Sequence, residues 1–379
     1  MYYCIRFYFC KINYMIREKY VNLHKRFSKP PYTYIIMDKK RTSLKDIAKE
    51  ANVSTSLVSF VLNNKEKEHR IRPEMAEKIR RVAIELNYTP NVAAKSLREG
   101  KSRTIGLIVS DISNPFFANI ARFVERTAGK YHYAVHFANS DENAEQTAML
   151  AENMISRGID GIIIVPCDGC KSLLNNLMDR RIPLVLLDRY IPDVDATYVC
   201  LNNRKAGYDA TRHLLENGYR HIGMVNYKFN LKHTIDRTLG YEDAMREAGL
   251  EKEIRKAFVD HRRMTDSCNA AISKMLKDKA DALIMATNTI STNCIHAIRR
   301  HKIIVPEQLG LVGFDGGDAF DFFYSPLSYI QQPLESMAQK AVEVLIEQIE
   351  EGSIFRQQIE YEGVLKKRAS SVKNSMRKI

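Results

Sequence analysis

The chain has 379 residues, of which 45% are hydrophobic and 27% charged, so it is long enough for two or three globular domains and too apolar to be largely disordered. Its net charge is +13, and the whole excess falls in residues 1–103, which hold 23 Lys and Arg against ten Asp and Glu. A basic head on a neutral body is typical of a protein that binds a polyanion with one end, although a basic face that serves only solubility is an equal alternative at this point.

The first 36 residues are aromatic and basic and show no clear helical or strand period. Arg6, Lys11 and Arg17 interrupt the apolar residues, and there is no small-residue cleavage site, so the segment does not fit a signal peptide. No stretch of the chain reaches the roughly 18 uninterrupted apolar residues that a membrane span needs, so no membrane partner is expected. Two interpretations of 1–36 remain: an over-long reading of a gene whose start is Met37, or a basic arm that adds non-specific DNA affinity.

Three short helices are expected next. Ser43 can cap the first, with Asp46 as the acidic partner of a capping box, and apolar residues then recur at helical spacing. Ser54 can cap a second helix over 55–62, and Pro73 can begin a third, because its missing N–H costs nothing at that position. Two helices joined by a short turn are the helix-turn-helix arrangement, which predicts a DNA-binding domain.

This predicted domain spans residues 37–88, and its second helix would lie in the major groove of duplex DNA. The residues expected to meet bases or phosphates are Leu44, Ser54, Thr55, Ser56, Ser59, Phe60 and Asn63. Val58, Val61 and Leu62 should instead face inward and hold the three helices together. The alternative is a helical packing module that contacts no DNA.

Residues 89–103 are predicted to be a linker that can become a helix, and the pattern changes from residue 104 onward. Apolar runs of strand length follow at 105–109, 133–138, 161–165, 184–187, 222–225, 282–286 and 309–314. The amphipathic helical stretches between them include 143–157, 204–217 and 237–248. Strands that alternate with helices predict an α/β body of parallel sheets covered by helices.

The alternation lasts about twice as long as one doubly wound sheet needs. Residues 104–371 are therefore predicted to form a two-lobed, doubly wound parallel α/β body, and 372–379 a tail. Ligands of such sheets bind at the carboxyl ends of the strands, so a cleft between the lobes is the expected ligand site.

Several motifs occur in the order in which they are found in the LacI/GalR family of bacterial regulators. They are the helix-turn-helix segment, Leu86–Asn91, Ala93–Leu97, Ile105–Ile108, Asp111–Phe117, Val312–Asp315 and Gln332-Pro333. Residues 41–371 therefore resemble this family from end to end. The resemblance implies a transcriptional regulator, expected to be a repressor, that binds a near-palindromic operator in double-stranded DNA as a homodimer, with its two heads about one helical turn, roughly 34 Å, apart.

In this family a hinge helix folds on operator DNA, pairs with its partner and wedges a leucine into the minor groove. The resemblance places Leu97 at that position, with Ala94 one helical turn before it on the same face. A leucine that packs on the body is the alternative. Phe60 departs from the family, because many members carry a polar or basic base-reading residue there. Phenylalanine can touch a thymine methyl but cannot make a bidentate contact to guanine, so the family's operator sequence is not carried over.

The resemblance also implies a body similar to periplasmic sugar-binding proteins, with a small effector, a sugar or sugar derivative, between the lobes. The matching positions are Asn114, Phe116, Phe117, Asp188, Arg237, Asn288 and Asp315. Acid, amide and guanidinium groups can pair with hydroxyls, and an aromatic face can pack on the C–H side of a sugar. Thr289 and Asn293 stand where many members have Asp and Gly, so an unusual effector, or none, is an alternative.

Each of these positions also has a structural interpretation. Asp188 can be a turn or cap residue, Phe116 and Phe117 can be core, and Arg237 can be a surface residue at the start of a helix. Two other functions remain as alternatives: a regulator that takes its signal from a protein partner, and an exported sugar-binding transport protein. A transport protein would have an export signal and no head. The predicted head and hinge over residues 43–98, and the poor fit of 1–36 to a signal peptide, argue against it.

The sequence gives no support for catalysis, metal binding or a cofactor. It has no phosphate-loop, nucleophile-elbow or zinc-protease motif and its ten His do not cluster, so no catalysis, metal or cofactor is expected. Cys167 and Cys170 form one CxxC without a second ligand pair and are expected to be ordinary loop cysteines. Seven scattered cysteines argue for a reducing compartment, so a cytoplasmic protein is expected.

Overall fold

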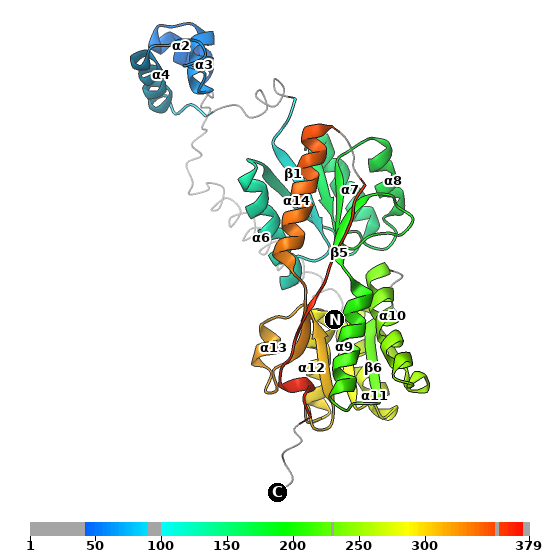
Figure 1. The fold of residues 1–379 in the computed structure, drawn as a ribbon. Helices are drawn as coiled ribbons and strands as arrows, with labels where there is room; N and C mark the ends of the chain where they lie inside the picture. Colours follow the sequence, from blue (N-terminus) through cyan, green and yellow to red (C-terminus); the bar gives the residue numbers. More distant parts are fainter. Residues whose placement is uncertain (1–41, 90–99, 229–230, 353–355, 374–379) are drawn as a thin grey trace, which may run out of the picture. The chain divides into compact units, whose positions relative to one another are not determined.

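The computed structural model describes residues 42–89, 100–228, 231–352 and 356–373 (Figure 1). They fall into two compact units, here called the head, within residues 1–91, and the body, within residues 92–379. The extension 1–36 and the predicted hinge residues Ala94 and Leu97 lie outside the described residues. In the described part of the chain, no helix is both long enough and apolar enough to cross a membrane.

The helices of the head are α2 (Leu44–Ala51), α3 (Thr55–Leu62) and α4 (Pro73–Glu85). The predicted capping box is confirmed, because the Ser43 hydroxyl accepts from the Asp46 amide while the Asp46 carboxylate accepts from the Ser43 amide at 2.8 Å. The Ser54 hydroxyl caps α3 by accepting from the Leu57 amide at 3.2 Å. Asn52, in the left-handed region with a φ of 55°, ends α2 and turns the chain toward α3.

The head has a small core of its own. Ile47, Val58, Val61 and Ile79 are fully buried where its three helices meet. The prediction that Val58 and Val61 face inward is confirmed, whereas Leu62 is only partly buried at the edge of this cluster. Packing on this core fixes the direction of α3 within the head.

The first lobe of the body, lobe 1, contains a six-stranded sheet in the order β11-β5-β4-β3-β1-β2, and every strand in it is parallel to its neighbours. Its strands are β1 (Thr104–Val109), β2 (Ala134–Asn139), β3 (Gly161–Ile164), β4 (Leu184–Asp188), β5 (Thr197–Leu201) and β11 (Gln358–Tyr361). Its helices are α6 (Pro115–Lys130), α7 (Ala144–Ser156), α8 (Lys171–Asp179) and α14 (Leu334–Glu351). Helices α6 and α14 cover one face and α7 and α8 the other (Figure 1), which explains the continuous apolar runs of the central strands.

Lobe 2 contains a second six-stranded sheet, in the order β12-β10-β9-β8-β6-β7, in which only β12 is antiparallel to its neighbour. Its strands are β6 (Ile222–Tyr227), β7 (Arg255–Val259), β8 (Ala282–Met285), β9 (Gly310–Phe314), β10 (Ser328–Gln331) and β12 (Val364–Lys366). Its helices are α9 (Asn203–Glu216), α10 (Lys232–Glu247), α11 (Met264–Lys277), α12 (Asn288–Arg300) and α13 (Asp318–Phe322), with 3-10 turns at Glu251–Glu253, His261–Arg263 and Ala369–Ser371.

The described chain passes between the lobes three times: from β5 to α9, from β10 to α14 and from β11 to β12. Asp188 ends β4 in lobe 1, and Asp315 follows β9 in lobe 2. Both line the same cavity between the lobes, so the carboxyl ends of the two parallel sheets meet there, as expected for ligand sites of this architecture.

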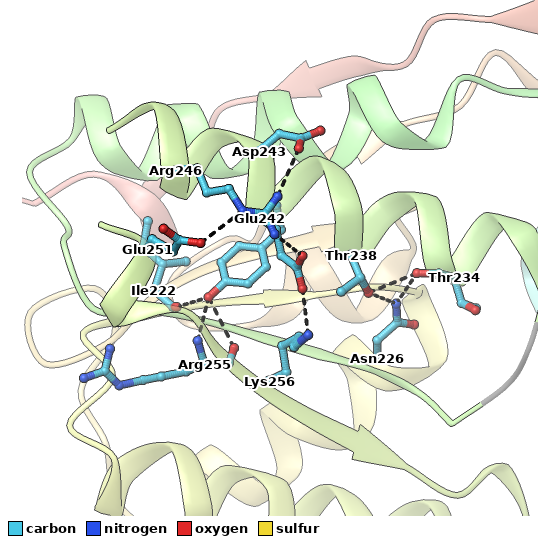
Figure 2. A network of polar contacts seen from close by, with 11 residues as sticks. Ile222, Asn226, Thr234, Thr238, Glu242, Asp243, Arg246, Glu251, Arg255 and Lys256 are labelled. Atoms are coloured by element: carbon cyan, nitrogen blue, oxygen red, sulfur yellow. Dashed lines mark hydrogen bonds and ion pairs between the residues drawn. The ribbon is translucent and has the colours of Figure 1, made fainter. Parts of the chain in front are cut away.

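Helix α10 is fixed tightly against its neighbours in lobe 2. A Cβ atom at Gly207 of α9 would overlap the Arg237 carbonyl oxygen, and one at Gly240 of α10 would overlap a carbonyl of α9, so only glycine allows the two backbones this approach. On its other side, Glu242 forms ion pairs with Arg246 at 2.7 Å and with Lys256 of β7 at 2.6 Å (Figure 2). These contacts determine where α10 presents its inner residues.

The α/β prediction is confirmed, and all seven predicted strands are present with ends shifted by at most two residues. Strands β5, β7, β10, β11 and β12 are not predicted by the apolar runs. The helix expected over 237–248 begins earlier, at Lys232. Arg237 therefore lies inside α10 with only 3% of its surface exposed, and the interpretation of a surface residue at a helix start is wrong.

Candidate functional site

The exposed start of α3 is the candidate nucleic-acid interface. Ser54, Thr55 and Ser56 lie there and are exposed. The first turn of this helix carries no acidic residue, so its dipole is not offset by a carboxylate of its own. A helix N-terminus with this character attracts phosphate through its amide groups and its partial positive charge.

The other predicted DNA contacts are partly engaged within the head. Leu44 packs against the head core, and the Asn63 side-chain amide donates to the Ser59 carbonyl at 2.6 Å. The Phe60 ring stacks on His69, with ring centroids 3.5 Å apart. The structure therefore brings three of the seven predicted residues together at an exposed helix end and places the other four partly inside the head.

A cavity of about 350 Å³ between the lobes is the candidate small-molecule site. All seven predicted effector residues line it: Asn114, Phe116, Phe117, Asp188, Arg237, Asn288 and Asp315. They come from α6 and β4 of lobe 1 and from α10, α12 and the end of β9 in lobe 2. The fold thus brings together residues separated by up to 201 positions in the sequence.

Asp188 and Asp315 face this cavity from equivalent places in the two lobes. Each follows directly on buried strand residues and has a left-handed backbone, with φ of 69° and 72°. Aspartate tolerates this conformation better than most residues, and such conformations cluster at functional sites. Burial raises the pKa of Asp188 to about 6, and it also raises the pKa of Asp315, against the opposing effect of Arg237.

Arg237 is held in place by neutral partners. Its Nε donates to Asn203 Oδ1 at 2.8 Å, and its Nη1 donates to the Ala286 carbonyl. The guanidinium lies over the Phe314 ring, 4.3 Å from the centroid. Burial lowers the pKa of Arg237, while Asp315 and Asp188 act in the opposite direction. The arrangement fixes one charged, planar donor group in the wall of the cavity.

Arg189 also lines the cavity and is not predicted by the sequence. Its Nη1 donates to the Glu142 carboxylate at 2.8 Å, its Nε lies 3.3 Å from Asp188 Oδ2, and its guanidinium lies 5.6 Å from the Phe117 ring centroid. The signal was available, because Arg189 directly follows the predicted site residue Asp188 at the end of an apolar run.

Several buried polar atoms at this cavity have no hydrogen-bond partner. Six such side-chain atoms exist among the described residues, and four of them belong to residues that line it: Ser110 Oγ, Arg189 Nε, His233 Nδ1 and Gln332 Oε1. The charge pair of Arg189 Nε with Asp188 lacks hydrogen-bond geometry. Each unsatisfied buried group costs about 1–3 kcal/mol, so their concentration at one cavity favours a polar occupant there, either water or a polar ligand.

Two asparagines join the lobes at this cavity. The Asn288 amide donates to Asn114 Oδ1 at 2.7 Å, and the Asn114 amide donates to Asn288 Oδ1 at 3.2 Å and to Thr289 Oγ1 at 3.3 Å. Thr289 is one of the two positions that depart from the family pattern, and its hydroxyl here takes part in the contact between lobes. Phe116 and Phe117 line the cavity but also pack in the core of lobe 1, so both interpretations apply to them.

Two other features of lobe 1 are weaker candidates for a site. Cys167 and Cys170 are buried in lobe 1 with their sulfur atoms 3.2 Å apart, and no group of three metal-ligating side chains occurs among the described residues. A larger hollow of about 760 Å³ lies at the other end of the lobe 1 sheet, beside Gly100 and Gln348. None of the unpartnered buried atoms found in the described chain lines that hollow, which favours the smaller cavity as the ligand site.

Comparison with known families agrees with this division of the chain. Residues 43–91 match the bacterial regulatory proteins of the lacI family, and residues 102–367 match the periplasmic binding proteins and sugar-binding domain of the LacI family. The second match alone covers more than half of the chain.

Individual relatives agree with the family match. The HTH-type transcriptional repressor PurR of Aliivibrio salmonicida is 30% identical over 82% of this chain and 92% of its own length. The ribose operon repressor of Haemophilus influenzae is 29% identical over 81% of this chain and 92% of its own length.

Solved structures show the same fold. The lac repressor dimer bound to operator is 20% identical, has a TM-score of 0.77 and covers 88% of this chain and 100% of its own. A LacI-type regulator of Alkaliphilus metalliredigens in complex with D-xylulofuranose is 25% identical, has a TM-score of 0.64 and covers 71% of this chain and 99% of its own. The chain therefore belongs to the LacI family of bacterial regulatory proteins and is a DNA-binding transcriptional regulator.

Proposed function

We propose that the protein is a cytoplasmic, non-enzymatic repressor that binds a near-palindromic operator as a homodimer and responds to a neutral monosaccharide in the cavity between its lobes. The single observation that supports the effector is that four buried, unpartnered polar atoms belong to residues that line that cavity. No cofactor is part of the proposal.

The exposed start of α3 supports the DNA-binding role of the head. Ser54, Thr55 and Ser56 would contact bases and phosphates in the major groove. Leu97, with Ala94 on the same helical face, would enter the minor groove as the hinge wedge. The relative described as a lac repressor dimer bound to operator supports the homodimer and the operator.

The charges around the cavity support a neutral effector. Its buried wall holds two guanidinium groups, and both already interact with carboxylates: Arg189 pairs with Glu142 and Asp188, and Arg237 is attracted electrostatically to Asp315 and Asp188. An anionic sugar would add negative charge to a wall in which three carboxylates, Glu142, Asp188 and Asp315, already outnumber the two guanidinium groups. A neutral polyol supplies both donors and acceptors, which the unpartnered hydroxyl, guanidinium, imidazole and amide atoms require.

The size of the cavity supports a single sugar ring. About 350 Å³ is at the lower end of the range for small-molecule sites, which runs from roughly 300 to 1,000 Å³. Relatives named for ribose control and for a xylulofuranose complex point to the same class. A sugar that contacts both lobes would favour one orientation of the lobes over the others, and so shift the population of the state that binds operator.

Titration calorimetry on the full chain tests the effector class, with D-ribose, D-xylulose, cellobiose and D-ribose 5-phosphate as probes. We expect heat of binding with at least one neutral monosaccharide, and binding at least tenfold weaker for the phosphate ester and the disaccharide. Tighter binding of the phosphate ester than of every neutral sugar would refute the charge argument.

Selection of bound duplexes from a random pool tests the DNA role. An enriched near-palindrome is expected at physiological salt, and its affinity should change when the bound sugar is added. If no sugar binds but a palindrome is enriched, the protein is a regulator whose signal comes from elsewhere. Recovery of no enriched sequence would contradict the operator.

A further inference from the structure

The described end of the linker, residues 100–103, is held to lobe 1 by two carboxylates. Asp160, in the loop before β3, accepts from the backbone amides of Ser102 at 2.7 Å and Arg103 at 2.8 Å. Glu350, in the last turn of α14, accepts from Lys101 Nζ at 2.6 Å and from Arg103 Nη1 at 2.9 Å. One carboxylate therefore fixes the backbone of this segment and the other fixes its side chains.

Glu350 is itself held in position. The Tyr133 hydroxyl donates to Glu350 Oε1 at 3.0 Å, and the Arg103 guanidinium lies over the Tyr133 ring, 5.2 Å from the centroid. The hydrogen bond from Lys101 lowers the pKa of Glu350, so the carboxylate is ionised at neutral pH. Three elements of lobe 1 thus meet at this one side chain: the start of β1, the end of α14 and Tyr133 before β2.

The opposite end of α14 lies at the candidate effector site. Gln332, two residues before the helix, lines the cavity, and its side-chain amide donates to Asp315 at 2.7 Å. Its Oε1 is one of the four buried atoms that have no partner there. With 18 residues, α14 is about 27 Å long, so a single helix spans the distance from this cavity to the linker.

Helix α14 is packed too closely on the lobe 1 sheet to slide along it. A Cβ atom at Gly161 of β3 would lie only 3.0 Å from side-chain carbons of Leu345 and Ile349. The helix also buries Met337, Ala341 and other residues of its inner face in the core of lobe 1. It therefore moves with lobe 1 as one rigid element, which is the kind of element that can carry coupling between distant sites.

We propose that Glu350 is the positioning residue that fastens the linker to lobe 1, so that a reorientation of lobe 1 on effector binding is passed to the predicted hinge. The inference rests on the proposed function, since it concerns how the cavity controls the head. Without Glu350 the side chains of Lys101 and Arg103 lose their common anchor, while the cavity and its residues are untouched. Exposed ion pairs contribute little to stability, so the variant should fold normally.

The test compares Glu350→Gln with Glu347→Gln in the full chain. Glu347 is exposed on the same helix and forms no ion pair with the described residues, so it controls for the loss of one negative charge. Operator affinity is measured with and without D-ribose, or whichever neutral sugar of the panel binds the wild type, on the duplex obtained by selection. We expect sugar affinity within twofold of wild type in both variants, and a sugar effect on operator affinity that falls at least threefold in Glu350→Gln only.

Hydrogen exchange of the same three proteins gives a readout that needs no effector. The amides of residues 101–104 should exchange at least threefold faster in Glu350→Gln than in wild type or Glu347→Gln. An unchanged sugar effect in Glu350→Gln would overturn the inference while leaving the proposed function intact. If the wild type binds no sugar, the proposed effector fails, and unchanged exchange at residues 101–104 would then also overturn the role of Glu350.

Discussion

Replacement of Asp188 by asparagine should stabilise the ligand-free protein at neutral pH. The Asp188 carboxyl is 6% exposed, and burial raises its pKa from 3.8 to about 6 against the opposing charges of Arg189 and Arg237. The native protein therefore binds this proton more tightly than the unfolded chain does. Asparagine has nearly the same shape as the protonated side chain and carries no charge to bury.

The pKa also gives the size and the pH range of the effect. A pKa raised from 3.8 to about 6 corresponds to about 3 kcal/mol. The pKa of Asp188 is higher in the folded protein than in the unfolded chain. The free energy of unfolding therefore falls as the pH rises from about 4 to about 6, and the contribution of Asp188 stays constant above pH 6. Asp188→Asn should therefore match wild type near pH 4 and exceed it by up to about 3 kcal/mol at pH 7.

Urea unfolding between pH 4 and pH 8, followed by circular dichroism, is the appropriate assay, because the chain contains no Trp to report by fluorescence. The head and body need not unfold together, so the transition of the body is fitted separately. The control is Asp168→Asn, an exposed aspartate whose replacement should leave the curve unchanged.

A loss of stability of Asp188→Asn at pH 7 would refute the reasoning, because it would mean that the attraction to Arg189 and Arg237 outweighs the cost of burial. The same variant should bind the neutral sugar roughly 10- to 100-fold more weakly, the usual cost of losing a hydrogen bond to a charged group. A carboxylate that costs stability without ligand and contributes affinity with it is the expected signature of a binding residue.

Two further predictions, the first with a matched control substitution, concern other parts of the chain. Gly207→Ala should lower the free energy of unfolding of the body by about 1–3 kcal/mol, because the new Cβ atom overlaps the Arg237 carbonyl. The control, Gly129→Ala on α6, has open space around it and should raise the free energy of unfolding by about 0.5–1 kcal/mol. Equal effects of the two substitutions in urea unfolding would contradict the close approach of α9 and α10. Leu97→Ala should weaken binding to the selected operator at least tenfold and binding to scrambled duplex by less than twofold, measured by fluorescence anisotropy, and an equal loss on both duplexes would exclude a wedge.

The effector residues could be predicted because buried parallel strands are easy to recognise. The run Leu184–Leu187 is continuously apolar, so the polar residue that follows, Asp188, had to lie at a carboxyl end. The same logic applies to Asp315 after β9. Strand ends from two lobes then converge on one cavity because each lobe is a parallel sheet.

Other parts of the site could not be found in this way. Strand β7 begins with Arg255 and Lys256 at the edge of its sheet, so it has no continuous apolar run. Helix α10 begins with Lys232 and His233, before the regular apolar spacing, so that spacing predicts too late a start and gives no sign of the buried His233. The role of Gln332 depends on the path of the chain between lobes, which no local pattern reveals.

The three connections between the lobes have a consequence for how affinity is set. Arg237 is hydrogen-bonded to Asn203 just after the first connection, and Asp315 to Gln332 within the second, at 2.8 and 2.7 Å. Two of the charged groups that face the cavity are therefore attached to the segments that must bend when the lobes rotate. Any substitution that changes this bending will also displace the groups that hold the small molecule, so recognition and rotation cannot be tuned independently in this protein.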